Sequence, residues 1–162
     1  MIEVPVRVER LFRLPAPPDE AWALLRDVPR WAALFPGVAS IEPYAPAEGG
    51  RGGAGAFLWT MEPMGPPGGR VTTVYACDYT ADDAARTLTW TPIESVGNAR
   101  FEGEAALHEA PGGAAGTLRL EAALQIPAPR FVRAVVEPAV AAEMGRMTDG
   151  FLSRLRAAMG GA

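Results

Sequence analysis

Hydrophobic residues near the end of the chain recur every three or four positions, which is the spacing of one helical face. Charged and polar residues, Glu143 and Arg146 among them, fall on the opposite face. We therefore predict a long helix from Pro138 to Met159. Proline has no amide hydrogen to donate, so Pro138 should either open this helix or kink it off the preceding turn. The apolar stripe consists of Val136, Val140, Met144, Met147, Phe151 and Leu155.

The start of the chain has the other periodicity, strict alternation of apolar and charged residues. From Ile2 to Glu9 this alternation predicts a half-buried strand. Arg10 then takes a position on the apolar side, before Phe12 and Leu14 continue it. We expect either a bulge or twist near Arg10 or a side chain that reaches a polar spot in the interior.

Two short helices should follow this strand. Pro18 and the acidic residues after it suit a first helical turn, and the helix should run to about Arg26. Asp27 can cap a second helix from Pro29 to Phe35. These helices carry more apolar bulk than short surface helices need, so we expect them to plug an opening. The bulky residues are Trp22, Leu25, Trp31, Leu34 and Phe35.

The middle of the chain has no helical periodicity and predicts strands joined by turns rich in Gly, Pro and Asp. A glycine-rich stretch, Gly49–Gly55, has two interpretations, a phosphate cradle and a hairpin turn. We favour the turn, because the stretch leads into a strand and no Lys-Ser/Thr follows. The six predicted strands are Val38–Ala45, Gly53–Met61, Arg70–Tyr79, Arg86–Ile93, Asn98–Glu109 and Thr117–Ile126.

The element order predicts an α+β fold in which the long helix covers a seven-stranded, curved antiparallel sheet. Such a sheet is about 29 Å wide at roughly 4.8 Å per strand. One helix with its side chains covers only about 10 to 12 Å. The helix alone cannot bury the apolar face, so we expect the sheet to curl and the short helices to close one end. A hydrophobic cavity should result.

The amino-acid composition excludes several kinds of covalent, catalytic and metal site. The 162 residues suit one domain, and one cysteine excludes a disulfide within the chain. All fifteen basic residues are arginine, which excludes lysine Schiff bases. One histidine and one cysteine cannot build a His/Cys metal cluster, so we expect neither metal nor cofactor. The histidine, His108, should face solvent, which removes most support for histidine catalysis.

Charge and hydropathy bear on partners and location. A net charge of −4 without any basic run argues against nucleic acid as a partner. The first residues lack a basic leader with an apolar run, and no apolar stretch approaches the ~20 residues of a membrane span. We expect a soluble, cytoplasmic protein without stable membrane insertion. The sequence does not define the oligomeric state.

The segment Pro18-x-Glu-Ala-Trp-x-Leu-Leu-x-Asp27-x-x-x-Trp31-x-x-x-Phe35-Pro-Gly-Val38 resembles the opening motif of a large superfamily. This is the START-related, birch-pollen-allergen-like (SRPBCC) superfamily. Its polyketide cyclase/dehydrase-like and coenzyme-Q-binding-protein-like branch is the most similar, and a group associated with carbon monoxide dehydrogenase is a near relative. The resemblance implies a helix-grip fold with an elongated apolar cavity, gated near the short helices. It carries over no catalytic residues.

Candidate cavity residues follow from strand parity and from the helical stripe. Each has two interpretations, core packing and cavity lining. Cys77 shares a face with two of them and is best interpreted as an inert buried thiol. The candidates are Trp59, Tyr75, Tyr79, Trp90, Phe101, Leu120, Met144, Met147 and Phe151.

Three functions remain open at this point. The leading hypothesis is non-catalytic binding or transport of a hydrophobic small molecule, such as a lipid, polyketide or isoprenoid-like compound. The second is a cyclase or dehydratase that uses Tyr75 and Tyr79, with Glu62 or Glu94 if these face inward. The third is a protein-interaction module that uses no cavity ligand.

Overall fold

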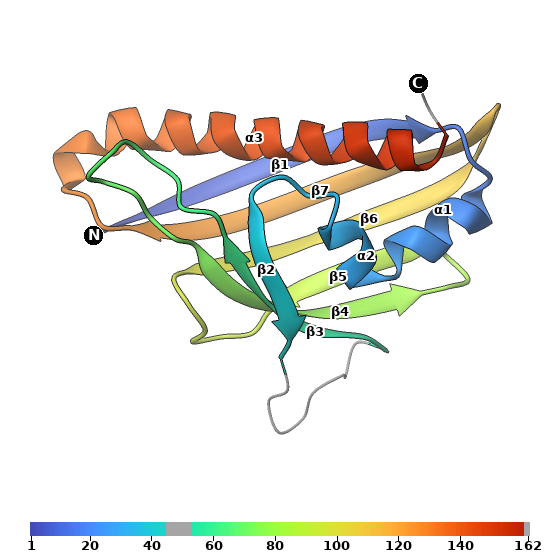
Figure 1. Cartoon of the computed structure of the whole chain (residues 1–162), viewed down its shortest axis with the longest axis horizontal. Coiled ribbons are helices and arrows are strands. Elements are labelled where there is room, and N and C mark those ends of the chain that lie inside the picture. Colours follow the sequence, from blue (N-terminus) through green and yellow to red (C-terminus); the bar gives the residue numbers. More distant parts are fainter. Residues whose placement is uncertain (45–52, 161–162) are drawn as a thin grey trace.

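The computed structural model describes residues 1–44 and 53–160 and has the α+β helix-grip architecture expected from the sequence. Seven antiparallel strands lie in the order β1-β7-β6-β5-β4-β3-β2. Figure 1 shows α3 running along the sheet, with α1 and α2 near the end where α3 finishes. The elements are β1 Ile2–Leu14, α1 Pro18–Leu25, α2 Val28–Ala32, β2 Val38–Pro43, β3 Gly53–Met61, β4 Val74–Asp82, β5 Thr87–Pro92, β6 Ala99–Ala110, β7 Gly113–Ile126, the 3₁₀ turn η1 Arg130–Val132 and α3 Arg133–Ala158.

Strand β1 contains no bulge at Arg10, so that expectation was wrong. The strand pairs with β7 in one uninterrupted register, from Ile2 opposite Ile126 to Leu14 opposite Ala114. Arg10 stays on the inner side of the sheet but does not enter the interior. Its Nε donates to Asp149 Oδ1 of α3 at 2.7 Å, and its side chain is 35% exposed. The edge strand lies next to α3, so this long side chain reaches the helix instead.

Helix α3 begins at Arg133, five residues earlier than predicted, and Pro138 lies inside it. The expectation that Pro138 opens the helix was therefore wrong. The Arg133 guanidinium fixes the first turn, because it donates to Glu137 Oε1 at 2.6 Å and to the Glu3 carbonyl oxygen at 3.1 Å. These bonds hold the start of the helix at the edge of the sheet. Pro138, about one turn later, has no backbone N–H and so removes one hydrogen bond within the helix.

Several strand boundaries also differ from the prediction, and two strands begin more than one residue from their predicted starts. Strand β4 begins at Val74 rather than Arg70, because the preceding residues form a loop closed by an isolated bridge between Met64 and Val71. Strand β7 begins at Gly113 rather than Thr117, because the tight turn before it lets the ladder start with Ala110 opposite Gly113. Most of the stretch predicted as a turn or phosphate cradle, 49–52, lies outside the described residues.

The hydrophobic core lies between the concave face of the sheet and the C-terminal half of α3. The buried residues of α3 all fall from Met144 onward, whereas Val136 and Val140 are only half-buried. The apolar stripe is therefore a core element over only part of its length. On the opposite, outer face of the sheet His108 is exposed, as predicted.

Candidate ligand cavity

All nine residues predicted from the sequence lie around one cavity between the concave face of the sheet and α3. The space open to the centre of a water-sized sphere is about 60 Å³. Pockets for drug-sized ligands measure roughly 300–1,000 Å³. A ligand of that size therefore requires the walls to move apart. The nine residues are Trp59, Tyr75, Tyr79, Trp90, Phe101, Leu120, Met144, Met147 and Phe151.

Stacked aromatic rings form the strand side of the cavity. Trp59 and Tyr75, opposite each other on β3 and β4, lie nearly parallel at 8° with centroids 5.8 Å apart. Tyr75 stacks in turn on Phe101 of β6, with centroids 4.0 Å apart. Trp90 of β5 lies 6.1 Å from Tyr79. Aromatic side chains from four strands thus line the strand side of the cavity.

Helix α2 and the residues after it close the cavity from another side. The Trp31 ring lies 5.3 Å from Trp59 and 5.7 Å from Phe151 of α3. Phe35 lies 5.3 Å from Phe151. The plug predicted from the short helices is present, and Trp31 and Phe35 are themselves lining residues. Sequence reasoning gave them the plugging role but did not include them among the lining residues.

Other lining residues were also missed. Strand parity would have found Met61 beside Trp59, and Leu118 and Leu124 beside Leu120. Thr148 was missed because it is polar, although it lies one helical turn after Met144. It is fully buried, and its hydroxyl donates to the Met144 carbonyl oxygen at 2.8 Å. The buried Thr148 hydroxyl is thus paired with a backbone carbonyl of its own helix.

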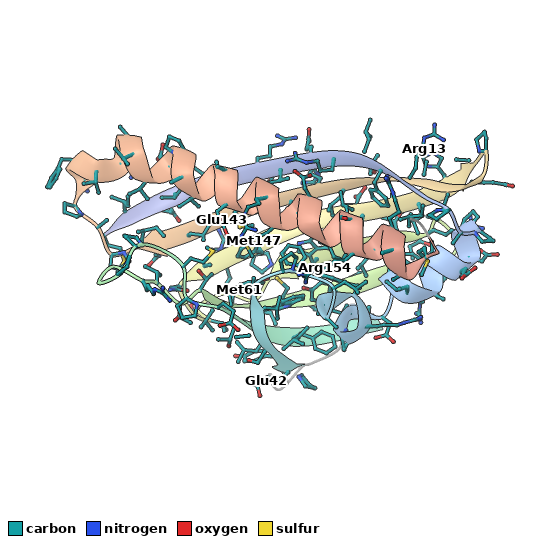
Figure 2. The ribbon with its side chains drawn as sticks, turned by 45° about the horizontal axis from the view of Figure 1, so that its top comes forward. Arg13, Glu42, Met61, Glu143, Met147 and Arg154 are labelled. Carbon is teal, nitrogen blue, oxygen red and sulfur yellow. The ribbon has the colours of Figure 1, made fainter. Side chains whose placement is uncertain are left out.

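The turn after α2 packs directly against α3 because both sides carry glycine. Gly37 has a φ of +79°, and a Cβ there would lie 3.0 Å from Met147 Cε and 4.0 Å from Met61 Cε. A Cβ on Gly150 would lie 2.9 Å from Pro36 Cγ. Figure 2 labels the two methionines, on α3 and β3. The seam between Pro36–Gly37 and α3 closes one side of the cavity without room for larger side chains.

The described cavity lining contains no charged side chain. Glu62 and Glu94 are exposed, and Glu94 pairs with Arg100, so neither supports the two tyrosines as a general acid or base. Burial raises the pKa of the Tyr75 and Tyr79 hydroxyls well above 10.0. It also raises the pKa of the Cys77 thiol to about 12. These groups are neutral at physiological pH, and the thiol is inert as predicted.

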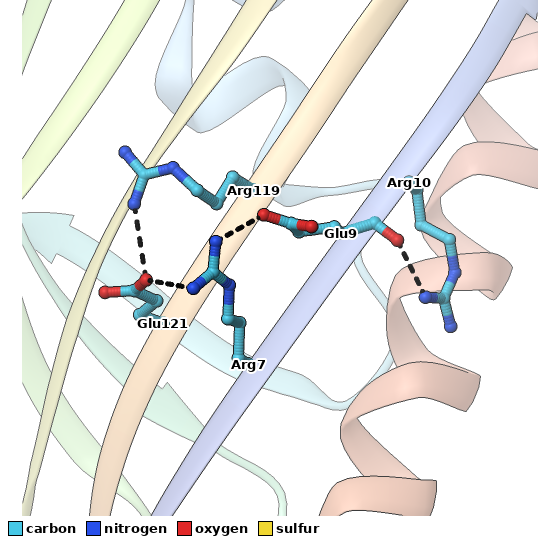
Figure 3. Close-up of polar contacts among 5 residues, drawn as sticks. All are labelled: Arg7, Glu9, Arg10, Arg119 and Glu121. Atoms are coloured by element: carbon cyan, nitrogen blue, oxygen red, sulfur yellow. Dashed lines mark hydrogen bonds and ion pairs between the residues drawn. The ribbon is translucent and has the colours of Figure 1, made fainter.

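Charged side chains of β1 and β7 form a run of ion pairs on the outer face of the sheet. The Arg7 guanidinium lies 2.6 Å from Glu9 Oε1 through Nη2 and 3.7 Å from Glu121 Oε1 through Nη1. Arg119 Nη1 lies 3.6 Å from the same Glu121 oxygen. Figure 3 shows this run of contacts crossing β1 and β7. Within residues 1–44 and 53–160, no group of His, Cys, Asp and Glu side chains is arranged to hold a metal ion. No described helix has the length and apolar character needed to cross a membrane.

The curved sheet gripping a long C-terminal helix, with an apolar cavity between them, is a helix-grip fold that this chain shares with solved structures named as a START superfamily protein and as Ara h 8.0201. The chain belongs to the family described as "Polyketide cyclase / dehydrase and lipid transport", which matches residues 5–160. The resemblance found in the motif from Pro18 to Val38 is therefore confirmed. No curated protein matches the chain in sequence.

Solved structures agree with this fold. TTHA0849 from Thermus thermophilus is 25% identical, with 95% of this chain and 98% of that chain covered and a TM-score of 0.67. The Zhui aromatase/cyclase from Streptomyces sp. R1128 is 17% identical, with coverages of 96% and 94% and a TM-score of 0.70. A START superfamily protein from Mycobacterium smegmatis is 13% identical, with coverages of 95% and 97% and a TM-score of 0.64.

Proposed function

We propose that this protein binds or carries a hydrophobic small molecule in the cavity between the sheet and α3, without catalysing a reaction. The observation that carries this proposal is the uncharged, predominantly apolar lining, in which eight of the twenty side chains are aromatic. Such a lining stabilises apolar ligands by removing their surface from water, at roughly 25 cal/mol per Å². The family description, which includes lipid transport, supports the same function.

A cyclase or dehydratase is the second candidate, and the fold shared with an aromatase/cyclase favours it. General acid/base catalysis works best with a group whose pKa lies near the working pH. The titratable side chains of the described lining are two tyrosines, whose pKa values lie well above 10.0. Binding therefore takes precedence over catalysis in our proposal.

Native mass spectrometry of the purified protein tests the proposal. We expect either a co-purified apolar ligand or a 1:1 adduct with N-phenyl-1-naphthylamine, a neutral fluorescent hydrophobe. A fluorescence titration with the same compound should saturate at one site per chain. No co-purified ligand together with no saturable binding would contradict the proposal.

A further inference from the structure

Two tryptophans of the cavity carry polar groups that no atom of the described residues satisfies. Among the buried side-chain nitrogen and oxygen atoms of the described residues, only Nε1 of Trp31 and Nε1 of Trp59 lack a hydrogen-bond partner. A buried donor left unpaired costs about 1–3 kcal/mol, so most buried polar groups are paired. Trp22 follows that rule, because its Nε1 donates to Asp83 Oδ1 at 2.8 Å. The two exceptions therefore require an explanation.

Both exceptions border the cavity. Trp31 lies on α2 and is 9% exposed, whereas Trp59 lies on β3 and is 2% exposed. Their ring centroids are 5.3 Å apart, so two donors from different elements lie in one part of the lining. An indole N–H donates and cannot accept. The missing partner is therefore a hydrogen-bond acceptor.

Tyr79 is an alternative partner for Trp59. Burial raises the pKa of the Tyr79 hydroxyl, whereas a hydrogen-bonding interaction with the Trp59 indole lowers it. The two side chains are thus close, but Trp59 Nε1 and the hydroxyl do not have the geometry of a hydrogen bond. Trp31 lies edge-on to Tyr79, with ring centroids 6.1 Å apart. A ligand acceptor would therefore compete with Tyr79 for the Trp59 donor, whereas the Trp31 donor has no such competitor among the described residues.

The surroundings define the charge and the shape of the acceptor. No cation lines the described cavity, and a buried carboxylate without a partner cation is strongly unfavourable. The aromatic side chains of the lining suit an aromatic ligand, because ring edges and faces contact each other favourably. We propose that the indole N–H groups of Trp31 and Trp59 bind the carbonyl oxygen of a neutral, planar aromatic ketone. This inference rests on the binding function proposed above and specifies its ligand class.

Three naphthalenes of nearly equal shape test the inference by isothermal titration calorimetry. They are 2-acetylnaphthalene, 2-isopropenylnaphthalene, in which CH₂ replaces the carbonyl oxygen, and the anion of 2-naphthoic acid. We expect the ketone to bind at least about 10-fold more tightly than the alkene, because each of the two hydrogen bonds contributes about 3-fold or more. The carboxylate should bind most weakly.

Substitution of each tryptophan tests whether its indole N–H causes the preference for the ketone over the alkene. Trp31→Phe and Trp59→Phe should each reduce the ketone-to-alkene affinity ratio about 3-fold or more, whereas Trp22→Phe, outside the cavity, should leave it unchanged. If a phenylalanine variant does not fold, 3-benzothienylalanine keeps the tryptophan shape and replaces the N–H with sulfur. The infrared C=O stretch of bound, ¹³C-labelled ketone should shift upward when a donor is lost.

The outcomes separate the two proposals. Equal affinity for ketone and alkene, unchanged in both tryptophan variants, would overturn the carbonyl site and leave hydrophobic binding intact. Loss of the preference in Tyr79→Phe alone would assign the carbonyl to the tyrosine and also overturn the inference. No binding of any naphthalene or of N-phenyl-1-naphthylamine would overturn the proposed function itself.

Discussion

Trp90 can lie flat on the inner face of the sheet because residue 103, opposite it on β6, is glycine. A Cβ at Gly103 would lie 2.5 Å from Trp90 Cζ2 and 2.2 Å from the Arg119 carbonyl oxygen. Both distances are shorter than any real Cβ contact, and one of the atoms belongs to the backbone. The aromatic wall of the cavity thus depends on a missing side chain as well as on those present.

Gly103→Ala should therefore destabilise the fold by about 1–3 kcal/mol, as overpacking does in other cores. The free energy of urea unfolding measures this. Gly69→Ala is the matched control, because a Cβ there meets Pro66 at an ordinary 3.6 Å and the backbone is unstrained. Equal stability of the two variants would contradict the close contact between Trp90 and β6.

Cys77 should not react with thiol reagents while the protein is folded. Its side chain is fully buried, and the raised pKa of about 12 keeps the thiol protonated, whereas the thiolate is the reactive form. Labelling with 5,5′-dithiobis(2-nitrobenzoate) at about pH 8 should be slow in buffer and complete in urea. Rapid labelling of the native protein would show that the hydrophobic core opens at Cys77.

Strand parity in the sequence identified several of the lining residues on the strands, because alternation fixes the face of each side chain. Trp59, Tyr75 and Trp90 were found in this way. The unpaired state of Trp31 and Trp59 was not predictable, because it depends on which acceptors the tertiary structure brings within about 3 Å. Sequence spacing contains no such information.

At the scale of elements, α3 divides into two halves with different attachments. From Met144 onward it buries Met144, Met147, Phe151 and Leu155, whereas no residue from Arg133 to Glu143 is buried. The first half also contains Pro138, which removes one helical hydrogen bond. The helix pattern was predictable, but its early start was not, because it depends on Arg133 reaching the Glu3 carbonyl oxygen of a distant strand.

Hydrogen exchange should reveal these two halves. Amides of residues 133–143 should exchange faster than those of residues 147–158, because shallow burial favours local opening. Exchange measured by mass spectrometry provides the comparison, with the paired centres of β6 and β7 as the slow reference. Equal protection along α3 would show that its first half is held as firmly as the second.

At the scale of the whole molecule, buried neutral acids predict a loss of stability in base. The pKa of the Cys77 thiol is 9.0 in the unfolded chain and about 12 in the folded protein, so the folded protein keeps this proton to higher pH. Burial also raises the pKa of Tyr75 and Tyr79 above 10.0. The unfolded state therefore binds fewer protons above pH 9, and stability falls as pH rises.

Urea midpoints should accordingly be constant up to about pH 8 and should fall progressively by about pH 11. The decrease should be smaller in Cys77→Ala, which lacks one of the three groups. A midpoint that stays constant over the whole range would show that these groups ionise in the folded protein as readily as in the unfolded chain.

The binding of N-phenyl-1-naphthylamine to the Met147→Trp variant tests the central claim most directly. Met147 is 2% exposed and lines the cavity, so the larger ring should occupy the ligand space. We predict one saturable site in the wild-type protein and in the control Leu11→Trp, whose position is 84% exposed. The Met147→Trp variant should lose that site with little change in its unfolding midpoint. Undiminished binding in a folded Met147→Trp variant would contradict the cavity as the ligand site.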